Sequence, residues 1–184
     1  YLVKNQNHRK AKHKSEIQNS DWLAVSDIKQ GDYIAAPKTR FKKTYVFIDA
    51  SNIIYGADDN GWKMDFAKLI KYLKTRFGAE KVFYYGGVDN KNKKQLNFYD
   101  KLKSFGYELR LNPVKSFVNV KGEFYQKADI DARMAFEAMK YEAEYEKAIF
   151  LTGDGDFYWL LEYLLQKKEI HLLAHVKRTA KELK

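Results

Sequence analysis

The sequence has no cysteine and only four histidines, which are scattered along its 184 residues. The absence of cysteine excludes disulfide bonds and zinc sites built on thiolates. The small number of histidines argues against a metal site based on imidazole. A metal bound by this chain would therefore be held by oxygen ligands, and we expect a cytoplasmic protein.

The sequence also lacks a long hydrophobic run. No stretch approaches the roughly 18 apolar residues that a transmembrane helix needs, so we expect no membrane span. Residues 1–20 are polar and basic and do not contain the apolar core of a secretory signal. Hydrophobic residues nevertheless make up 45% of the chain, which is enough for one folded domain with a buried core.

Negative charge is in the minority, with 24 acidic residues against 34 Lys and Arg and a net charge of +10. A basic protein is attracted to polyanions, and nucleic acid is the commonest of these. The excess charge could instead serve only to keep the surface solvated. Charge by itself therefore favours a nucleic-acid partner without identifying one.

The first 43 residues differ from the rest and form a basic leader. Within it, residues 21–37 (DWLAVSDIKQGDYIAAP) place short apolar pieces around a Gly31-Asp32 turn, which predicts a small β-hairpin. This piece resembles the closing strands of Hint modules from inteins. Because cysteine and the rest of a Hint domain are absent, we do not predict self-splicing. We expect the folded domain to occupy residues 44–184.

From residue 44 onward, short β-branched and aromatic runs alternate with segments of helical periodicity. This alternation is typical of βαβ units, and it predicts an α/β fold with a parallel sheet and helices on both faces. We expect strands at 45–49, 81–86, 107–111, 148–152 and 170–175, helices at 65–77, 91–105, 130–145 and 157–166, and an irregular or hairpin excursion at 114–126.

Carboxylates follow two of the predicted strands. Asp49 ends the first, ahead of Ser51 and Asn52, and the strand at 148–152 runs through Thr152 into Asp154 and Asp156. In an open parallel sheet, binding sites form beyond the carboxyl ends of the strands. We therefore expect these side chains to share one edge of the sheet.

Two further aspartates, Asp129 and Asp131, open the helix that leads into the strand at 148–152. A helix turns by about 100° per residue, so these two side chains point about 200° apart and cannot both face one pocket. Asp131 lies on the same face as the small residues Ala128 and Ala135, which would let the helix approach the sheet. This geometry favours Asp131 as the fourth member of the acidic group.

Carboxylates that converge on one pocket repel each other unless a cation neutralises them. A set of oxygen ligands suits Mg²⁺ or Mn²⁺, which can also activate water for phosphodiester cleavage. Each residue also has a purely structural interpretation: Asp154 or Asp156 as a helix cap, Asp131 as a partner of the helix dipole, and Asn52 as the cap of a short helix at 53–55. The combination of all four aspartates favours a shared site.

Basic and aromatic residues are predicted close to this edge. The lysines expected to contact RNA phosphates are Lys91, Lys93, Lys94, Lys115 and Lys127. The aromatic residues that could stack on unpaired bases are Tyr84, Tyr85, Phe117, Phe124 and Tyr125. For Tyr84 and Tyr85 the alternative is core packing, and for the lysines it is an ordinary solvated face.

Three segments together carry a family resemblance: residues 45–53 (YVFIDASNI), 127–131 (KADID) and 151–157 (LTGDGDF). They resemble the motifs of NYN domains, in particular those of the LabA-like branch of the PIN-like nuclease superfamily. Residues 83–87 (FYYGG) and 109–115 (LRLNPVK) follow the same pattern. The resemblance covers residues 43–174, and its most specific part is the Thr-Gly-Asp-x-Asp-Phe element.

The resemblance implies a three-layer PIN-like fold whose central parallel sheet has the strand order 3-2-1-4-5. It also implies a ribonuclease that depends on Mg²⁺ or Mn²⁺ and acts on single-stranded or structured RNA, and it is compatible with a homodimer. Asp49, Asp131, Asp154 and Asp156 fall on the acidic ligands of the family, and Asn52 falls on its asparagine after the first strand.

Roles follow from these positions. Asp49 and Asp154 would be inner metal ligands, while Asp131 and Asp156 would hold a second metal or metal-bound water. Asn52 and Thr152 would orient water or phosphate, with Ser51 in support. One departure from the family pattern is Glu137, which stands where many relatives have aspartate.

Four other functions are compatible with parts of this pattern. A non-catalytic RNA-binding or scaffold protein on the same fold is the main alternative, and the presence of the acidic residues favours the enzyme. A metal-dependent adhesion motif would need serine at Ile53, and an aspartyl phosphotransferase would need aspartate at Ser51. A dinucleotide site would need a Gly-x-Gly-x-x-Gly element after the first strand, which is missing.

Overall fold

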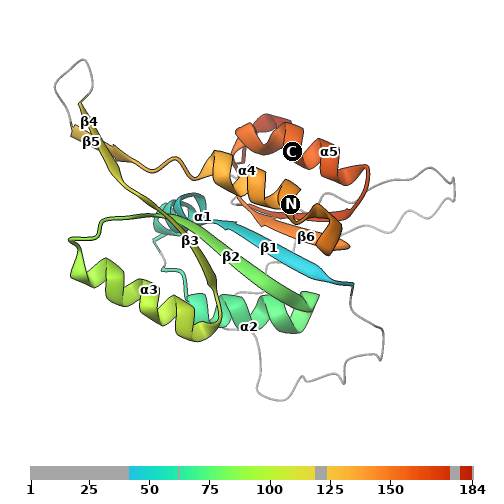
Figure 1. Cartoon of the computed structure of the whole chain (residues 1–184), viewed down its shortest axis with the longest axis horizontal. Helices are drawn as coiled ribbons and strands as arrows, with labels where there is room; N and C mark the ends of the chain where they lie inside the picture. The colour runs from blue at the N-terminus through green and yellow to red at the C-terminus, as the bar shows by residue number, and fades with distance from the viewer. Residues whose placement is uncertain (1–41, 62, 119–123, 175–178, 184) are drawn as a thin grey trace, which may run out of the picture. The chain divides into compact units, whose positions relative to one another are not determined.

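The computed structural model describes residues 42–61, 63–118, 124–174 and 179–183. The hairpin predicted within the basic leader lies outside these residues. Five parallel strands form the central sheet in the order β3-β2-β1-β6-β7, which confirms the predicted fold class and strand order (Figure 1). The strands are β1 (Thr44–Asp49), β2 (Ala79–Val88), β3 (Glu108–Pro113), β6 (Lys147–Leu151) and β7 (Glu169–Leu173).

Helices cover both faces of this sheet, as Figure 1 shows. On one face lie α1 (Ala50–Asp58), α2 (Phe66–Phe77) and α3 (Lys93–Phe105), and on the other lie α4 (Asp131–Lys140) and α5 (Tyr158–Leu165). All six residues of β1 are buried, as expected for a central strand with helices on both sides. The sheet therefore separates two hydrophobic cores.

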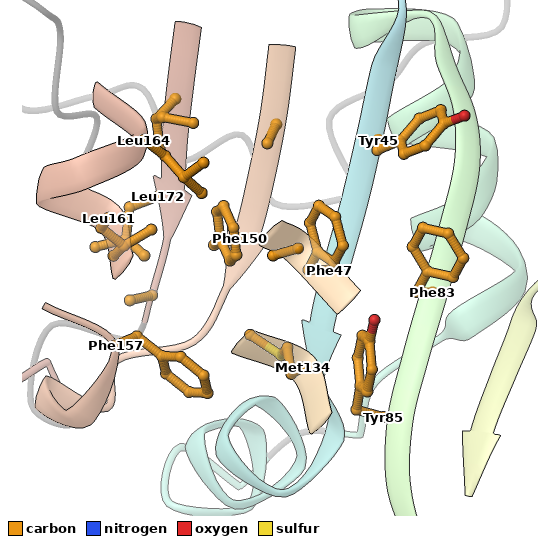
Figure 2. Close-up of a cluster of buried hydrophobic side chains, with 14 of the residues drawn as sticks. Tyr45, Phe47, Phe83, Tyr85, Met134, Phe150, Phe157, Leu161, Leu164 and Leu172 are labelled. Carbon is orange, nitrogen blue, oxygen red and sulfur yellow. The ribbon is translucent and has the colours of Figure 1, made fainter. Parts of the chain in front are cut away.

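Aromatic residues dominate the core beneath α4 and α5. Side chains alternate between the two faces of a strand, so Tyr45 and Phe47 of β1 point to this core. The ring of Phe47 stacks between those of Phe83 and Phe150, with centroids 5.4 and 5.0 Å away (Figure 2). Such packing fixes the relative positions of β2, β1 and β6, and with them the edge where the acidic residues lie.

Capping residues mark both ends of α2 and α3. The Asp65 side chain accepts a hydrogen bond from the Lys68 amide and begins α2, and Asn92 does the same for Gln95 in α3. Both helices end at a glycine in the left-handed region, with φ of 65° at Gly78 and 100° at Gly106.

Three segments differ from the expectation or resolve it. The helix expected at 53–55 is α1, nine residues long. The helix expected at 130–145 ends at Lys140, because the chain turns through η2 (Glu142–Glu144) to bury Tyr145, whose hydroxyl donates to the Ala138 carbonyl. The excursion at 114–126 contains an antiparallel hairpin of β4 (Lys115–Val118) and β5 (Phe124–Lys127).

Within the described ranges, no helix is both long enough and apolar enough to cross a bilayer.

Candidate functional site

The carboxyl ends of β1 and β6 bring Asp49 and Thr152 together. The two strands pair in parallel up to Ile48 and Leu151, so the residue that follows each pair lies at the sheet edge. The Thr152 hydroxyl donates a 3.1 Å hydrogen bond to Asp49 Oδ2 and accepts one of 3.2 Å from the Asp154 amide. One buried hydroxyl therefore joins the ends of both strands.

Asn52 makes a second connection between the same two segments. Its backbone amide donates to Asp49 Oδ1 (3.1 Å), and its side-chain Oδ1 accepts from the Gly153 amide (2.9 Å). The neighbouring Ser51 is exposed, and its backbone amide also stabilises the Asp49 carboxylate. The predicted grouping of these residues at one edge is thus present in the fold.

Asp49 carries the most unusual environment of the acidic residues. Only 5% of the residue is exposed. Burial raises the pKa of its carboxyl, and the charge of Asp154 raises it further, against the hydrogen bonds from Asn52 and Thr152 that lower it. The groups that stabilise the carboxylate are uncharged donors. The fold therefore holds a carboxylate here at an energetic cost.

Asp49 also has a structural role that the sequence analysis did not assign to it, because it caps α1. Asparagine or serine can cap a helix equally well without bringing a charge into a buried position. Capping alone thus accounts for a polar side chain at this position, but not for its negative charge.

Asp154 and Asp156 lie in the turn that follows β6. Asp154 is partly buried and caps η3 (Gly155–Phe157), with its Oδ1 accepting from the Asp156 amide at 3.0 Å. Asp156 is exposed in the same turn, while Phe157 is buried and anchors it to the core. The capping interpretation is correct for Asp154, and the cap keeps its carboxyl group at the sheet edge near Asp49.

Asp131 is the first residue of α4 and is partly buried. The helix packs against both β1 and η3, the two elements that carry Asp49 and Asp156. Asp129, in contrast, is exposed and pairs with Lys115 at 3.4 Å. The structure thus places Asp129 in a surface ion pair and Asp131 at the start of the helix that borders the site.

Gly87, near the end of β2, allows the segment before α4 to pass close to the sheet edge. A Cβ atom on Gly87 would come within 2.9 Å of Val114 Cγ2 and 3.0 Å of Ala128 Cβ. Only glycine therefore leaves room for the segment before α4 to cross the end of β2.

Glu137 takes no part in the acidic edge. Its Oε2 lies 2.6 Å from Arg110 Nε and accepts from the Tyr85 hydroxyl, and its Oε1 accepts from Arg133 Nε at 3.0 Å. Burial alone would raise the pKa of Glu137, but the bonds from Arg110 and Arg133 outweigh it and keep the pKa below the usual value. This carboxylate ties α4 to β2 and β3, an interaction that the sequence analysis missed.

Four of the five predicted RNA-binding lysines are exposed. Lys91, Lys93 and Lys94 lie in the connection after β2 and in the first turn of α3. Lys115 is also exposed, in its pair with Asp129, whereas the Lys127 side chain lies outside the description, as do those of the hairpin aromatics Phe117, Phe124 and Tyr125.

The tyrosines of β2 are core residues. Tyr84 is 1% exposed and Tyr85 is fully buried. These two rings are therefore unable to stack on RNA bases, because both lie beneath helices. The core-packing alternative is correct for them.

The donor atoms at the edge suit a hard divalent cation. Asp49 supplies carboxylate oxygens from the end of β1 and Asp154 from the turn after the adjacent strand β6, and Mg²⁺ commonly binds through one or two carboxylates together with water. In the part of the chain covered by the structure, no three carboxylate or imidazole side chains gather in a metal-binding arrangement. The residues fit an ion held by a carboxylate pair, and ligation by all four aspartates stays a prediction.

Comparisons with known proteins agree with this fold. The family model of the NYN domain matches residues 43–184. The chain is 30% identical to the low amplitude and bright protein LabA of Synechococcus elongatus. The matched region is 131 residues long and covers 69% of each protein.

Among solved structures, the chain resembles a protein of unknown function, VPA0982, from Vibrio parahaemolyticus. The TM-score is 0.67 at 21% identity, covering 80% of this chain and 90% of the other. This likeness concerns the fold. Because the NYN family model matches most of the length of this chain, the chain belongs to the NYN domain family.

Proposed function

We propose that this chain is a metal-dependent ribonuclease that hydrolyses phosphodiester bonds at the edge formed by Asp49, Thr152 and Asp154. The observation that carries the proposal is the buried Asp49 carboxylate, which shares Thr152 with the turn of Asp154 and has its pKa raised by burial and by the Asp154 charge. A cation at this edge would offset that cost, because it favours the ionised form.

Asp49 and Asp154 are the proposed ligands of Mg²⁺ or Mn²⁺, with Asp131 and Asp156 as outer ligands that hold water. When bound, such an ion lowers the pKa of a water molecule and stabilises the charge that develops on the phosphate. Asn52 and Thr152 are assigned a positioning role, since their oxygens bond to the Gly153 amide and to Asp49.

The basic surface supports RNA as the substrate. Lys91, Lys93 and Lys94 follow the carboxyl end of β2, the strand next to β1, and are exposed to solvent. Phosphate contacts from such residues fix the position of a strand without reading its sequence. Lys115 and Lys127 belong to the hairpin β4–β5 beyond β3, and we propose that they extend this contact.

A cleavage assay tests the proposal. Labelled single-stranded RNA and DNA of the same sequence are incubated with the chain in Mg²⁺, Mn²⁺ or EDTA, beside the variants Asp154→Asn and Asp100→Asn. Asp100 is an exposed residue of α3 and serves as the charge-matched control. We expect RNA cleavage that requires metal, persists in Asp100→Asn and is lost in Asp154→Asn.

The alternative function is RNA binding without cleavage on the same fold. It is favoured by one observation, that the described residues bring fewer than three potential metal ligands into a binding arrangement. RNA binding with no cleavage in any metal would select this alternative and contradict the nuclease.

A further inference from the structure

Helix α5 carries an exposed row of side chains that the proposed catalytic edge does not use. Trp159 is 75% exposed, the highest value among the large hydrophobic side chains in the described part of the chain. Tyr163 is 36% exposed, and Lys167 follows just after the helix ends. An indole that is so exposed buries little apolar surface in the folded chain and is available to contact a partner.

The spacing of these residues aligns them with the acidic edge. Asp156 belongs to η3 and Trp159 to α5, which begins at Tyr158 directly after η3 and packs against it. Trp159 and Tyr163 are four residues apart and share one face of α5, and Lys167, in the turn beyond the helix, lies against the Tyr163 ring. The row therefore begins beside the Asp154 turn and leads away from it along α5.

Neighbouring groups hold the row in place. The Tyr158 ring packs edge-on against Trp159, with centroids 5.1 Å apart and planes at 81°, and its hydroxyl bonds to Glu162 at 3.0 Å. At the far end, the Lys167 ammonium lies 4.1 Å from the centre of the Tyr163 ring. The indole and the ammonium are thus positioned before any ligand arrives.

A flat indole and a cation suit the two parts of a nucleotide chain. Unpaired bases stack on exposed aromatic rings, whereas the bases of a duplex are already stacked and paired. Tyr163 lies one helical turn from Trp159, about 6 Å along the axis, and holds the Lys167 ammonium against its ring, so one strand could contact both the indole and the cation.

We propose that this row binds a single-stranded RNA segment that runs from the acidic edge, with a base stacked on Trp159 and a phosphate at Lys167. The proposal rests on the proposed function for the direction of the strand, and it names single-stranded RNA as the substrate class. We assign RNA as the ligand of the row because the row begins beside the proposed catalytic edge and ends in a positioned cation.

The experiment measures binding in EDTA, where cleavage that requires metal does not occur. A fluorescent 12-nucleotide single strand and a duplex of the same sequence are titrated with the wild type, Trp159→Phe, Trp159→Ala and Lys167→Gln. Tyr72→Ala is the matched control, because Tyr72 is a 45% exposed aromatic residue on α2, which covers the opposite face of the sheet. Circular dichroism checks the fold of each variant.

We expect Trp159→Ala to weaken single-strand binding by about 10-fold, within the range for loss of one stacking residue, and Trp159→Phe to retain most of it. Lys167→Gln should reduce the slope of log affinity against log salt by about 1. Duplex binding and the Tyr72→Ala variant should be unaffected. Equal affinity of Trp159→Ala and wild type would overturn the proposal.

The two proposals can fail separately. Loss of affinity in Trp159→Ala without any metal-dependent cleavage supports the row and contradicts the nuclease. Cleavage by the wild type together with unchanged binding by Trp159→Ala supports the nuclease and contradicts the row. A change of oligomeric state in Trp159→Ala with unchanged RNA affinity assigns the surface to a protein contact and overturns the row.

Discussion

Replacing Glu137 with glutamine removes the charge that Arg110 and Arg133 share. In the wild type, the Glu137 side chain is 10% exposed and that of Arg110 is 18% exposed, with 2.6 Å between Oε2 and Nε. Breaking a buried ion pair from one side costs about 3–5 kcal/mol. Arg110 keeps Glu108 at 3.1 Å, and Arg133 is 37% exposed, so we expect a value near the lower end, about 3 kcal/mol.

Urea denaturation at pH 7, followed by circular dichroism, measures this cost. The control is Asp100→Asn, which breaks an ion pair whose side chains are 64% and 74% exposed and should leave the midpoint almost unchanged. The reasoning is refuted if Glu137→Gln and Asp100→Asn unfold at the same urea concentration.

The same variant has an expected pH dependence. The folded pKa of Glu137 lies below its ordinary value of 4.5, so the stability that its charge contributes is present above pH 4.5 and is lost as the pH falls through the folded pKa. The difference in unfolding free energy between wild type and Glu137→Gln should therefore shrink in acid. A difference that grows below pH 4.5 would contradict the ion-pair account.

Three further predictions concern the edge and the surface. Thr152→Val, which removes the hydroxyl shared by the two strand ends, should cost about 1–3 kcal/mol in thermal unfolding and reduce RNA cleavage, and Thr152→Ser should restore both; equal behaviour of the two variants would contradict it. Gly87→Ala places a methyl group 2.9 Å from Val114 Cγ2 and should lower stability by about 1–3 kcal/mol, so an unchanged melting temperature would be inconsistent with the crowding described. Charge reversal of Lys93 and Lys94 should reduce the salt dependence of RNA binding, measured by fluorescence anisotropy, and an unchanged slope would remove these lysines from the interface.

Much of the fold could be predicted from local patterns. Buried strands read as short apolar runs, and Asp65 stands where a capping residue is expected before α2, whereas the start of α3 at Lys93, capped by Asn92, was placed two residues too early. The strand order came from the family resemblance, because no periodicity states which strands are neighbours. The end of α4 at Lys140 was missed, since no glycine or proline marks it and the cause is the burial of Tyr145.

The edge was partly predictable for a similar reason. Asp49 and Asp154 follow parallel strands, whose carboxyl ends meet at one side of a sheet. The hydroxyl of Thr152 as a bridge, and Asp49 as a cap, depend on register and backbone direction that the sequence does not state. The Arg110–Glu137 pair joins residues 27 positions apart, whereas Arg133 and Glu137, four apart on one helix, were a signal that could have been used.

The most direct test of the account is RNA cleavage by Asp49→Asn. Asparagine can cap α1 as aspartate does, and since the fold raises the pKa of Asp49, removal of its charge should leave the protein at least as stable at pH 7. We predict a folded variant with an unchanged or higher melting temperature and no metal-dependent cleavage of single-stranded RNA. A folded Asp49→Asn that cleaves RNA like the wild type, with the same metal requirement, would contradict the claim that this buried carboxylate serves catalysis.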